Sequence, residues 1–337
     1  MKHSIALALL VAACGTSDED YKQQVISGMH ASIEADLADL ITATQAIQDA
    51  APSGHGWDAT SDAAAITAMK TAWKNARVAY EHVEGATAPL FPDEDASMDA
   101  RYDDYLVTLG VTGDQDLFDD QGATGMHSIE RILFAPEIPQ KVIDFEKELP
   151  GYKAAAWPTN ATEADELKTK LCQKLVDDAK KLHAEWQPAA IDIGLAFQGL
   201  IGLMNEQKEK VNLAATGEEE SRYAQLTLFD LRNNLEGTTK IYDLFQPWVQ
   251  SKGGDQDDMI QAGFAKLNQL YTTNSGDAVP PVPETWSSDA PSAADLATPF
   301  GVLWSGVHVA VDATTAGSIV FEMNEVAAAL GFPEFAE

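Results

Sequence analysis

Apolar residues recur at helical spacing along almost the whole chain after residue 20. The longest example is the segment 21–50, whose apolar residues fall at i, i+3 and i+4 positions over roughly eight turns: Val25, Ile26, Met29, Ile33, Leu37, Leu40 and Ile41. No segment sustains the alternation of apolar and polar residues that is typical of strands. We therefore predict an all-α protein with antiparallel helical bundles.

Proline and glycine divide the rest of this pattern into further helices. The predicted helices are 63–88, 164–185, 189–214, 218–245, 255–271, 294–311 and 316–330. A loop with a short helix is expected within 93–104, and 274–293 is expected to be a long surface loop because it is rich in Pro, Ser, Gly and Asp. Prolines concentrate between 136 and 158, which predicts a linker between an N-terminal bundle over 21–150 and a C-terminal bundle over 160–337.

The charge balance limits the partners of the chain. Its 337 residues include 53 acidic and 22 basic side chains, which gives a net charge of −31. Such a surface repels nucleic acids and concentrates cations. For most of these carboxylates, solubility or a saline habitat is a sufficient explanation.

The N-terminus has the pattern of a signal peptide. An apolar run over 5–13 is too short to span a bilayer as a mature helix, but it has the length of the apolar region of a signal peptide. The run ends in Leu10-Val11-Ala12-Ala13-Cys14, which resembles the lipobox of bacterial lipoproteins. The resemblance implies a signal peptide over 1–13, a lipidated Cys14 and a polar tether over 14–20. The alternative is an ordinary secretory signal with a chance cysteine.

Two further features follow from the cysteines. Gly15, rather than aspartate, follows Cys14, which in a Gram-negative cell implies an outer-membrane anchor facing the periplasm. Cys172 is the only cysteine left in the mature chain, so lipidation of Cys14 would exclude an intrachain disulfide. Cys172 lies among apolar residues and is predicted to be a small core residue.

A histidine and a glutamate are spaced for one face of a helix. The segment 122–125 is predicted to be a loop, followed by a helix in which His127 and Glu130 are neighbours at i and i+3. Gly125 would allow another backbone or a ligand to approach closely. Borderline and hard metal ions accept such a nitrogen and oxygen pair, although most isolated pairs of this kind have only structural roles.

Two carboxylates show the same spacing in the second predicted helix. Glu81 and Glu84 would share one face, and a bound cation would relieve their mutual repulsion. A plain salt bridge from Arg77 to Glu81 is the structural alternative. Asp99 is one acid among several in its loop, and composition alone cannot select it.

The ordered series of these segments resembles the imelysin family, whose hallmark is GxHxxE, and more closely its EfeO/EfeM-type branch of periplasmic iron-uptake proteins. The resemblance extends from about residue 21 to about residue 246. The matching segments are Ala76-Arg77-Val78-Ala79-Tyr80-Glu81-His82-Val83-Glu84, Met98-Asp99-Ala100-Arg101-Tyr102-Asp103, Gly125-Met126-His127-Ser128-Ile129-Glu130, Gly202-Leu203-Met204-Asn205-Glu206, 216–223 and 229–237.

The resemblance implies two pseudo-symmetric antiparallel four-helix bundles with a metal site in the cleft between them. Carried over by position, the implied ligands are Glu81, Glu84, Asp99, His127, Glu130 and Glu206. Iron is the cation that this branch implies, and an oxygen-rich set with one histidine also suits zinc, manganese or calcium. An inner-membrane permease or a peroxidase is the implied partner.

Several observations keep other functions open. The family takes its name from a member described as a protease, so a zinc metallopeptidase is the main alternative, although the chain has no HExxH. The third possible function is that of a polysaccharide-binding protein that binds its ligand through a bridging metal.

The chain also departs from the pattern of this branch. It has Ala224-Gln225-Leu226-Thr227 where the branch usually has Ser-His-Thr-Asp, which removes a histidine and an acid. Gly306-Val307-His308 repeats the Gly-x-His spacing, either by chance or because the chain holds two related bundles.

Overall fold

The computed structural model describes residues 16–109, 113, 114 and 116–336, so Cys14 and the predicted signal peptide lie outside the described residues. Within these ranges the chain is helical and contains no strand, which confirms the all-α prediction. Its first half contains α1 (Asp18–Ala50), α2 (Ala63–Glu81), α3 (Glu84–Thr87), α4 (Pro92–Asp99), α5 (Tyr102–Leu109), α6 (Gly125–Leu133) and α7 (Gln140–Glu146).

The second half continues with α8 (Ala161–Glu166), α9 (Cys172–Trp186), α10 (Ile193–Leu213), α11 (Thr227–Lys252), α12 (Gln256–Thr273), α13 (Ala293–Leu296), α14 (Pro299–Ala310) and α15 (Ile319–Leu330). A short 3₁₀ turn (Ala135–Glu137) follows α6, and a π-helical turn (Leu167–Leu171) joins α8 to α9. Among the described residues, no helix has both the length and the apolar character needed to cross a membrane.

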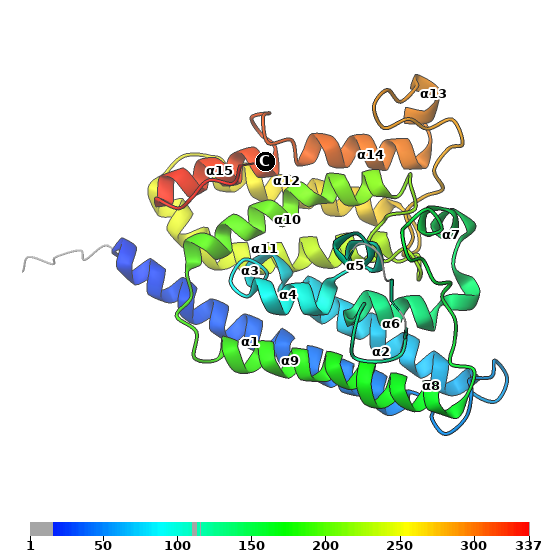
Figure 1. The fold of residues 1–337 in the computed structure, drawn as a ribbon. Helices are drawn as coiled ribbons and strands as arrows, with labels where there is room; N and C mark the ends of the chain where they lie inside the picture. The colour runs from blue at the N-terminus through cyan, green and yellow to red at the C-terminus, as the bar shows by residue number, and fades with distance from the viewer. Residues whose placement is uncertain (1–15, 110–112, 115, 337) are drawn as a thin grey trace, which may run out of the picture.

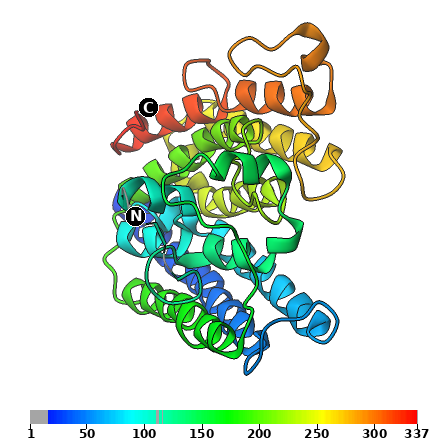
Figure 2. The same ribbon diagram turned by 45° about the vertical axis from the view of Figure 1, so that its right-hand side comes forward.

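The long helix α1 organises the first group of helices. The side chains of Ser17 and Asp20 form a capping box at its start. Of its predicted apolar stripe, Ile26 and Ile41 are half-buried and the other residues are buried. α1 packs against α2 and against α9, which lies beside it although α9 belongs to the second half of the sequence (Figures 1 and 2). Cys172, the first residue of α9, is buried as predicted. The first group in space therefore includes a helix from beyond the proline-rich segment.

The second group is formed by α10, α11, α12, α14 and α15, and it lies on the other side of α2 and α3 (Figure 1). A cluster of aromatic rings holds it together, with Phe197 from α10 packed edge-on against Phe245 from α11 at 4.9 Å. Phe332, which follows α15, contacts both rings. The predicted surface loop lies between α12 and α13 and contains no helix over 275–292.

Glycines bring the two groups into close contact. Gly237 of α11 lies against the backbone of His82, and Gly199 of α10 lies against the carbonyl of Gly85, so a Cβ at either glycine would overlap its neighbour. The predicted continuous helix over 63–88 is wrong at this point, because α2 ends at Glu81 and α3 is a separate turn. The break turns α3 toward α10, which packs against it.

Two other boundaries differ from prediction. The segment 93–104 contains most of α4 and the start of α5, and Ala100 and Arg101 separate the two helices. The helix predicted from 218 begins at Thr227, because 218–226 is held in a non-helical segment that reaches back to α6. Both differences bear directly on the candidate site.

Candidate metal centre

Gly125 starts α6 in a conformation that only glycine adopts easily. Its φ is +86°, and a Cβ there would lie 2.5 Å from the carbonyl oxygen of Met98 in α4. The predicted close backbone approach at Gly125 is therefore confirmed. It fixes the start of α6 against the end of α4, and so brings His127 close to Asp99.

His127 is held by a carboxylate one helical turn away. Its Nδ1 lies 2.9 Å from Oε2 of Glu130, while Oε1 of Glu130 accepts hydrogen bonds from the backbone N–H groups of Tyr223 (3.0 Å) and Ala224 (2.8 Å). A carboxylate can only accept hydrogen bonds, so Nδ1 carries the proton. Both oxygens of Glu130 are thus engaged, and its contacts orient the ring.

The other ring nitrogen faces two carboxylates. His127 Nε2 is buried and makes no hydrogen bond, and it lies 3.4 Å from Asp99 Oδ1 and 3.5 Å from Glu220 Oε1. One ligand atom from each of these three residues lies within 4.8 Å of the others. Ligands bonded to a metal at about 2.1 Å are themselves roughly 3.0–3.5 Å apart. The two distances from His127 Nε2 therefore match those between ligands of one metal ion.

A buried arginine provides the counter-charge. The guanidinium of Arg77 contacts Glu81 and Asp99, lies 3.1 Å from Glu220 and 3.5 Å from Asp230, and is fully buried. Without a cationic partner, burial would strongly disfavour the charged form of each of these carboxylates. The predicted salt bridge between Arg77 and Glu81 is present, as one part of a larger network.

The charges in this network shift the protonation of the three candidate ligands. Burial works against the charged form of His127, but Asp99 outweighs it and the pKa of the ring lies well above its usual value. Burial also opposes ionisation of Asp99 and Glu220, yet Arg77 lowers the pKa of Asp99, and Lys210 with His127 lowers that of Glu220 well below its usual range. Without metal, the centre consists of a protonated imidazole between two carboxylates.

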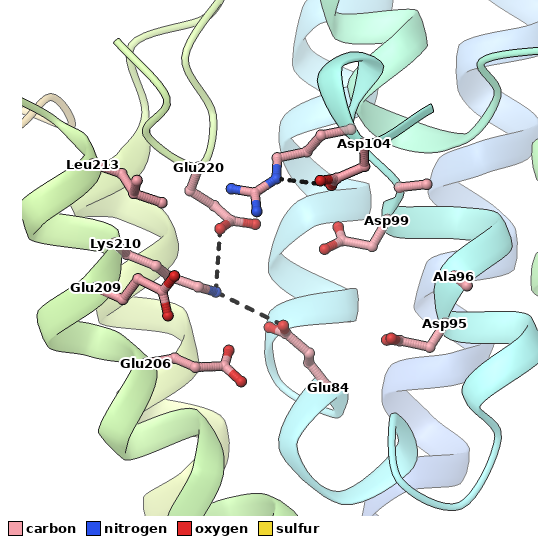
Figure 3. A pocket seen from close by; sticks show the side chains of 12 residues that line it. Glu84, Asp95, Ala96, Asp99, Asp104, Glu206, Glu209, Lys210, Leu213 and Glu220 are labelled. Carbon is pink, nitrogen blue, oxygen red and sulfur yellow. Dashed lines mark hydrogen bonds and ion pairs between the residues drawn. The ribbon is translucent and has the colours of Figure 1, made fainter. Parts of the chain in front are cut away.

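A cavity of about 470 Å³ opens beside this centre (Figure 3). Its walls come from α3, α4 and α5 on one side, and from α10 and the segment before α11 on the other. Lys210 reaches across it, with its Nζ 3.1 Å from Asn234 Oδ1, 3.5 Å from Glu220 and 3.7 Å from Glu84. The cavity thus connects solvent with residues from both groups of helices.

The structure places the six predicted ligands in different environments. Asp99 and His127 meet in the centre, and Glu130 positions His127. Glu81 is buried and bound by Arg77 and Asn234, while Glu84 and Glu206 line the cavity, where burial raises the pKa of Glu206 to about 7.

Sequence reasoning missed Glu220 as a candidate ligand. It lies between α10 and α11 in a run of three glutamates, which the resemblance covered without singling one out. Glu219 pairs with Lys141 at 2.9 Å, whereas Glu220 turns toward His127. The sequence does not distinguish these neighbours, because the backbone of the non-helical segment decides which one faces the centre. For Arg77 the sequence predicts only a salt bridge to Glu81.

The fold and the site define a class: an all-helical protein with a buried histidine and carboxylate centre at the junction of two helical groups. The sequence model of the imelysin family matches residues 26–283, more than half of the chain. The chain therefore belongs to the imelysin family.

Curated relatives and solved structures are consistent with this membership. The chain is 31% identical over 210 residues to Efem/EfeO family lipoproteins of Staphylococcus aureus strains MSSA476 and COL. The match covers 61% of this chain and 60% of each relative.

Two crystal structures share the fold. One, from Parabacteroides distasonis, is named an iron-regulated protein A precursor; it has a TM-score of 0.59 and 15% identity, and the match covers 94% of this chain and 97% of the other. The other is an imelysin-like protein from Psychrobacter arcticum, with a TM-score of 0.58, 13% identity, and coverage of 97% and 100%.

Proposed function

We propose that this chain is a metal-binding protein of the cell envelope that captures iron, or a similar cation, for uptake. The observation that carries the proposal is His127 Nε2, which is buried, without a hydrogen bond, and faces Asp99 and Glu220 while Glu130 holds the opposite nitrogen. A ligating histidine is usually oriented in this way by a second carboxylate. The oxygen-rich set suits iron, zinc, manganese or calcium better than a metal that prefers thiolates.

The proposal includes a lipid anchor at Cys14 and a location on the periplasmic side of the outer membrane. The lipobox-like sequence before Cys14 and the lipoprotein names of the S. aureus relatives support the anchor. The name of the P. distasonis structure supports iron. A permease or peroxidase that receives the metal is the expected partner.

We also propose that the centre lies in a cleft between two facing bundles. The cavity supports this arrangement, because its walls come from α3–α5 and from α10. In this arrangement α9 joins the first bundle in space, since it packs on α1 and α4. Glu220, from the second half of the chain, completes the centre.

A peptidase is the less favoured function. It requires a general base beside the metal, and Glu130 is the acid next to His127 that could take that role. Both oxygens of Glu130 are engaged by His127 and by two backbone N–H groups, which argues against it as a base.

The test is a metal titration of the protein without residues 1–14, using ferrous, ferric, zinc, manganese and calcium ions. We expect one ion per chain, and a loss of binding in His127→Ala and in Glu220→Gln. Glu148→Gln is a matched control, because this exposed acid does not line the cavity. Unchanged binding by His127→Ala would contradict the proposal. Casein cleavage that stops on addition of a chelator would favour the peptidase instead.

A further inference from the structure

We infer that the centre takes its cargo as an aquated cation and rejects anionic metal chelates, such as citrate complexes. The inference rests on the proposed metal binding and specifies the chemical form of its substrate. It follows from the charge of the cavity walls, from the contacts of the basic residues there, and from the position of the three ligands.

The walls of the cavity are acidic, although burial raises the pKa values of Asp95 and Glu206 to about 7. Four carboxylates come from the first half of the chain: Glu84, Asp95, Asp99 and Asp104. Three come from the second half: Glu206, Glu209 and Glu220. Among the residues that the structure describes, two basic side chains line the same space, Arg101 and Lys210. A cleft lined by one sign of charge concentrates ions of the opposite sign and repels those of its own sign.

Both basic side chains are engaged by the protein. Arg101 Nε lies 3.4 Å from Asp104, and its Nη1 lies 3.5 Å from the carbonyl oxygen of Glu218. Lys210 is shared between Glu220, Glu84 and the amide oxygen of Asn234. An anionic chelate needs a cationic partner to offset its desolvation. At this wall it would have to displace a carboxylate from Arg101 or Lys210.

The size of the cavity suits a hydrated ion. A water molecule occupies about 30 Å³, so an ion with six waters needs on the order of 200 Å³. The cavity of about 470 Å³ holds such an ion with room for about nine additional waters. A hydrated cation can therefore enter with its first shell intact and exchange waters for protein ligands inside.

Two of the candidate ligands, Asp99 and Glu220, line this space, and His127 lies beyond them with its Nε2 within 3.5 Å of both. The exposed fractions of the side chains are 1% for His127, 6% for Glu220 and 20% for Asp99. A metal already saturated by a chelator has no open position for these donors, whereas coordinated water leaves readily. Geometry and charge therefore select the same form of the cargo.

The first experiment offers both forms of metal to the purified full-length protein. Manganese, zinc and anaerobic ferrous ions are added as simple salts, and iron is added in parallel as ferric citrate with radiolabelled citrate. We expect stoichiometric retention of at least one simple ion and no retention of citrate after gel filtration. Citrate that co-elutes in proportion to iron would overturn this inference alone. If no simple ion binds, both the inference and the proposed function fail.

The second experiment tests the charge of the walls with matched variants. Asp104→Asn with Glu209→Gln removes two negative charges from the walls and leaves the three ligand residues and Glu130 intact. Asp39→Asn with Glu325→Gln removes two charges from exposed positions that do not line the cavity. We expect the association rate of the simple ion at low salt to fall about three- to tenfold in the first pair and to change little in the second. An equal effect in both pairs would contradict the steering argument.

Discussion

The substitution Glu130→Gln tests whether Glu130 positions His127 or is itself a ligand of the metal. Glutamine keeps the size of the side chain but replaces one acceptor oxygen by a donor NH₂ group. If its oxygen stays on the backbone N–H groups of Tyr223 and Ala224, the NH₂ group faces His127 Nδ1. Nδ1 must then be unprotonated to accept this hydrogen bond, so the neutral ring carries its proton on Nε2. Nε2 can bind a metal only after it has lost that proton.

The expected magnitudes follow from these contacts. Hydrogen bonds to a charged acceptor contribute about 1.5–3 kcal/mol each, against about 0.5–1.5 kcal/mol for neutral pairs. In Glu130→Gln the two backbone N–H groups bind a neutral acceptor, so the free energy of unfolding should fall by about 2–3 kcal/mol. Loss of an orienting partner weakens metal affinity about 10–100-fold, or roughly 1.4–2.7 kcal/mol.

Three measurements check this prediction. Chemical denaturation gives the loss of stability, metal titration gives affinity and stoichiometry, and ¹⁵N chemical shifts report the tautomer of His127. We expect one ion still to bind, more weakly, with the proton moved to Nε2. Glu148→Gln, which makes the same charge change at an exposed position, should leave all three values unchanged. Complete loss of binding with an unchanged tautomer and unchanged stability would show that Glu130 is itself a ligand, and our reasoning would be refuted.

Three other predictions concern His127, Gly125 and Glu146, whose carboxylate accepts a hydrogen bond from the hydroxyl group of Tyr223. The raised pKa of His127 keeps the metal-free ring protonated at neutral pH, so metal must displace a proton, and Kd measured by titration should rise about tenfold for each pH unit of acidification below that pKa. Gly125→Ala introduces strain at a positive φ and a collision with the Met98 carbonyl, and should lower the unfolding free energy in denaturant by about 2–4 kcal/mol; a loss below 0.5 kcal/mol would contradict this origin. Glu146→Gln weakens a buried ion pair with Arg131 (2.9 Å) and should reduce the free energy of unfolding by about 2–4 kcal/mol, with a smaller loss of metal affinity. An unchanged free energy of unfolding would show that the pair contributes nothing to stability.

The sequence predicted what short-range chemistry determines. The apolar stripe of α1, the loop before α6 and the burial of Cys172 depend on local spacing and composition, and the structure confirms them. The i, i+3 relation of His127 and Glu130 is equally local, and the two side chains are in contact.

Long-range contacts decide what could not be predicted. The helix breaks after Glu81, where Gly237, far away in sequence, packs against the backbone of His82. The segment 218–226 leaves the helical pattern because its N–H groups bind Glu130 of α6. That contact selects Glu220 over its two neighbours, and no pattern within the segment carries this information.

The second Gly-x-His sequence lies in a different structural setting from the first. Gly125 begins α6, whereas Gly306 lies inside α14, so the two histidines leave their helices in different settings. His308 stacks on Trp304 at 3.9 Å, its Nε2 lies 3.2 Å from Asn212, and burial lowers its pKa. Among the described residues, the only group of three His, Cys, Asp or Glu side chains placed to share a metal is Asp99, His127 and Glu220. The second half therefore contributes Glu220 and Lys210 to the centre in the first half, and a repeat of the motif would not by itself create another site.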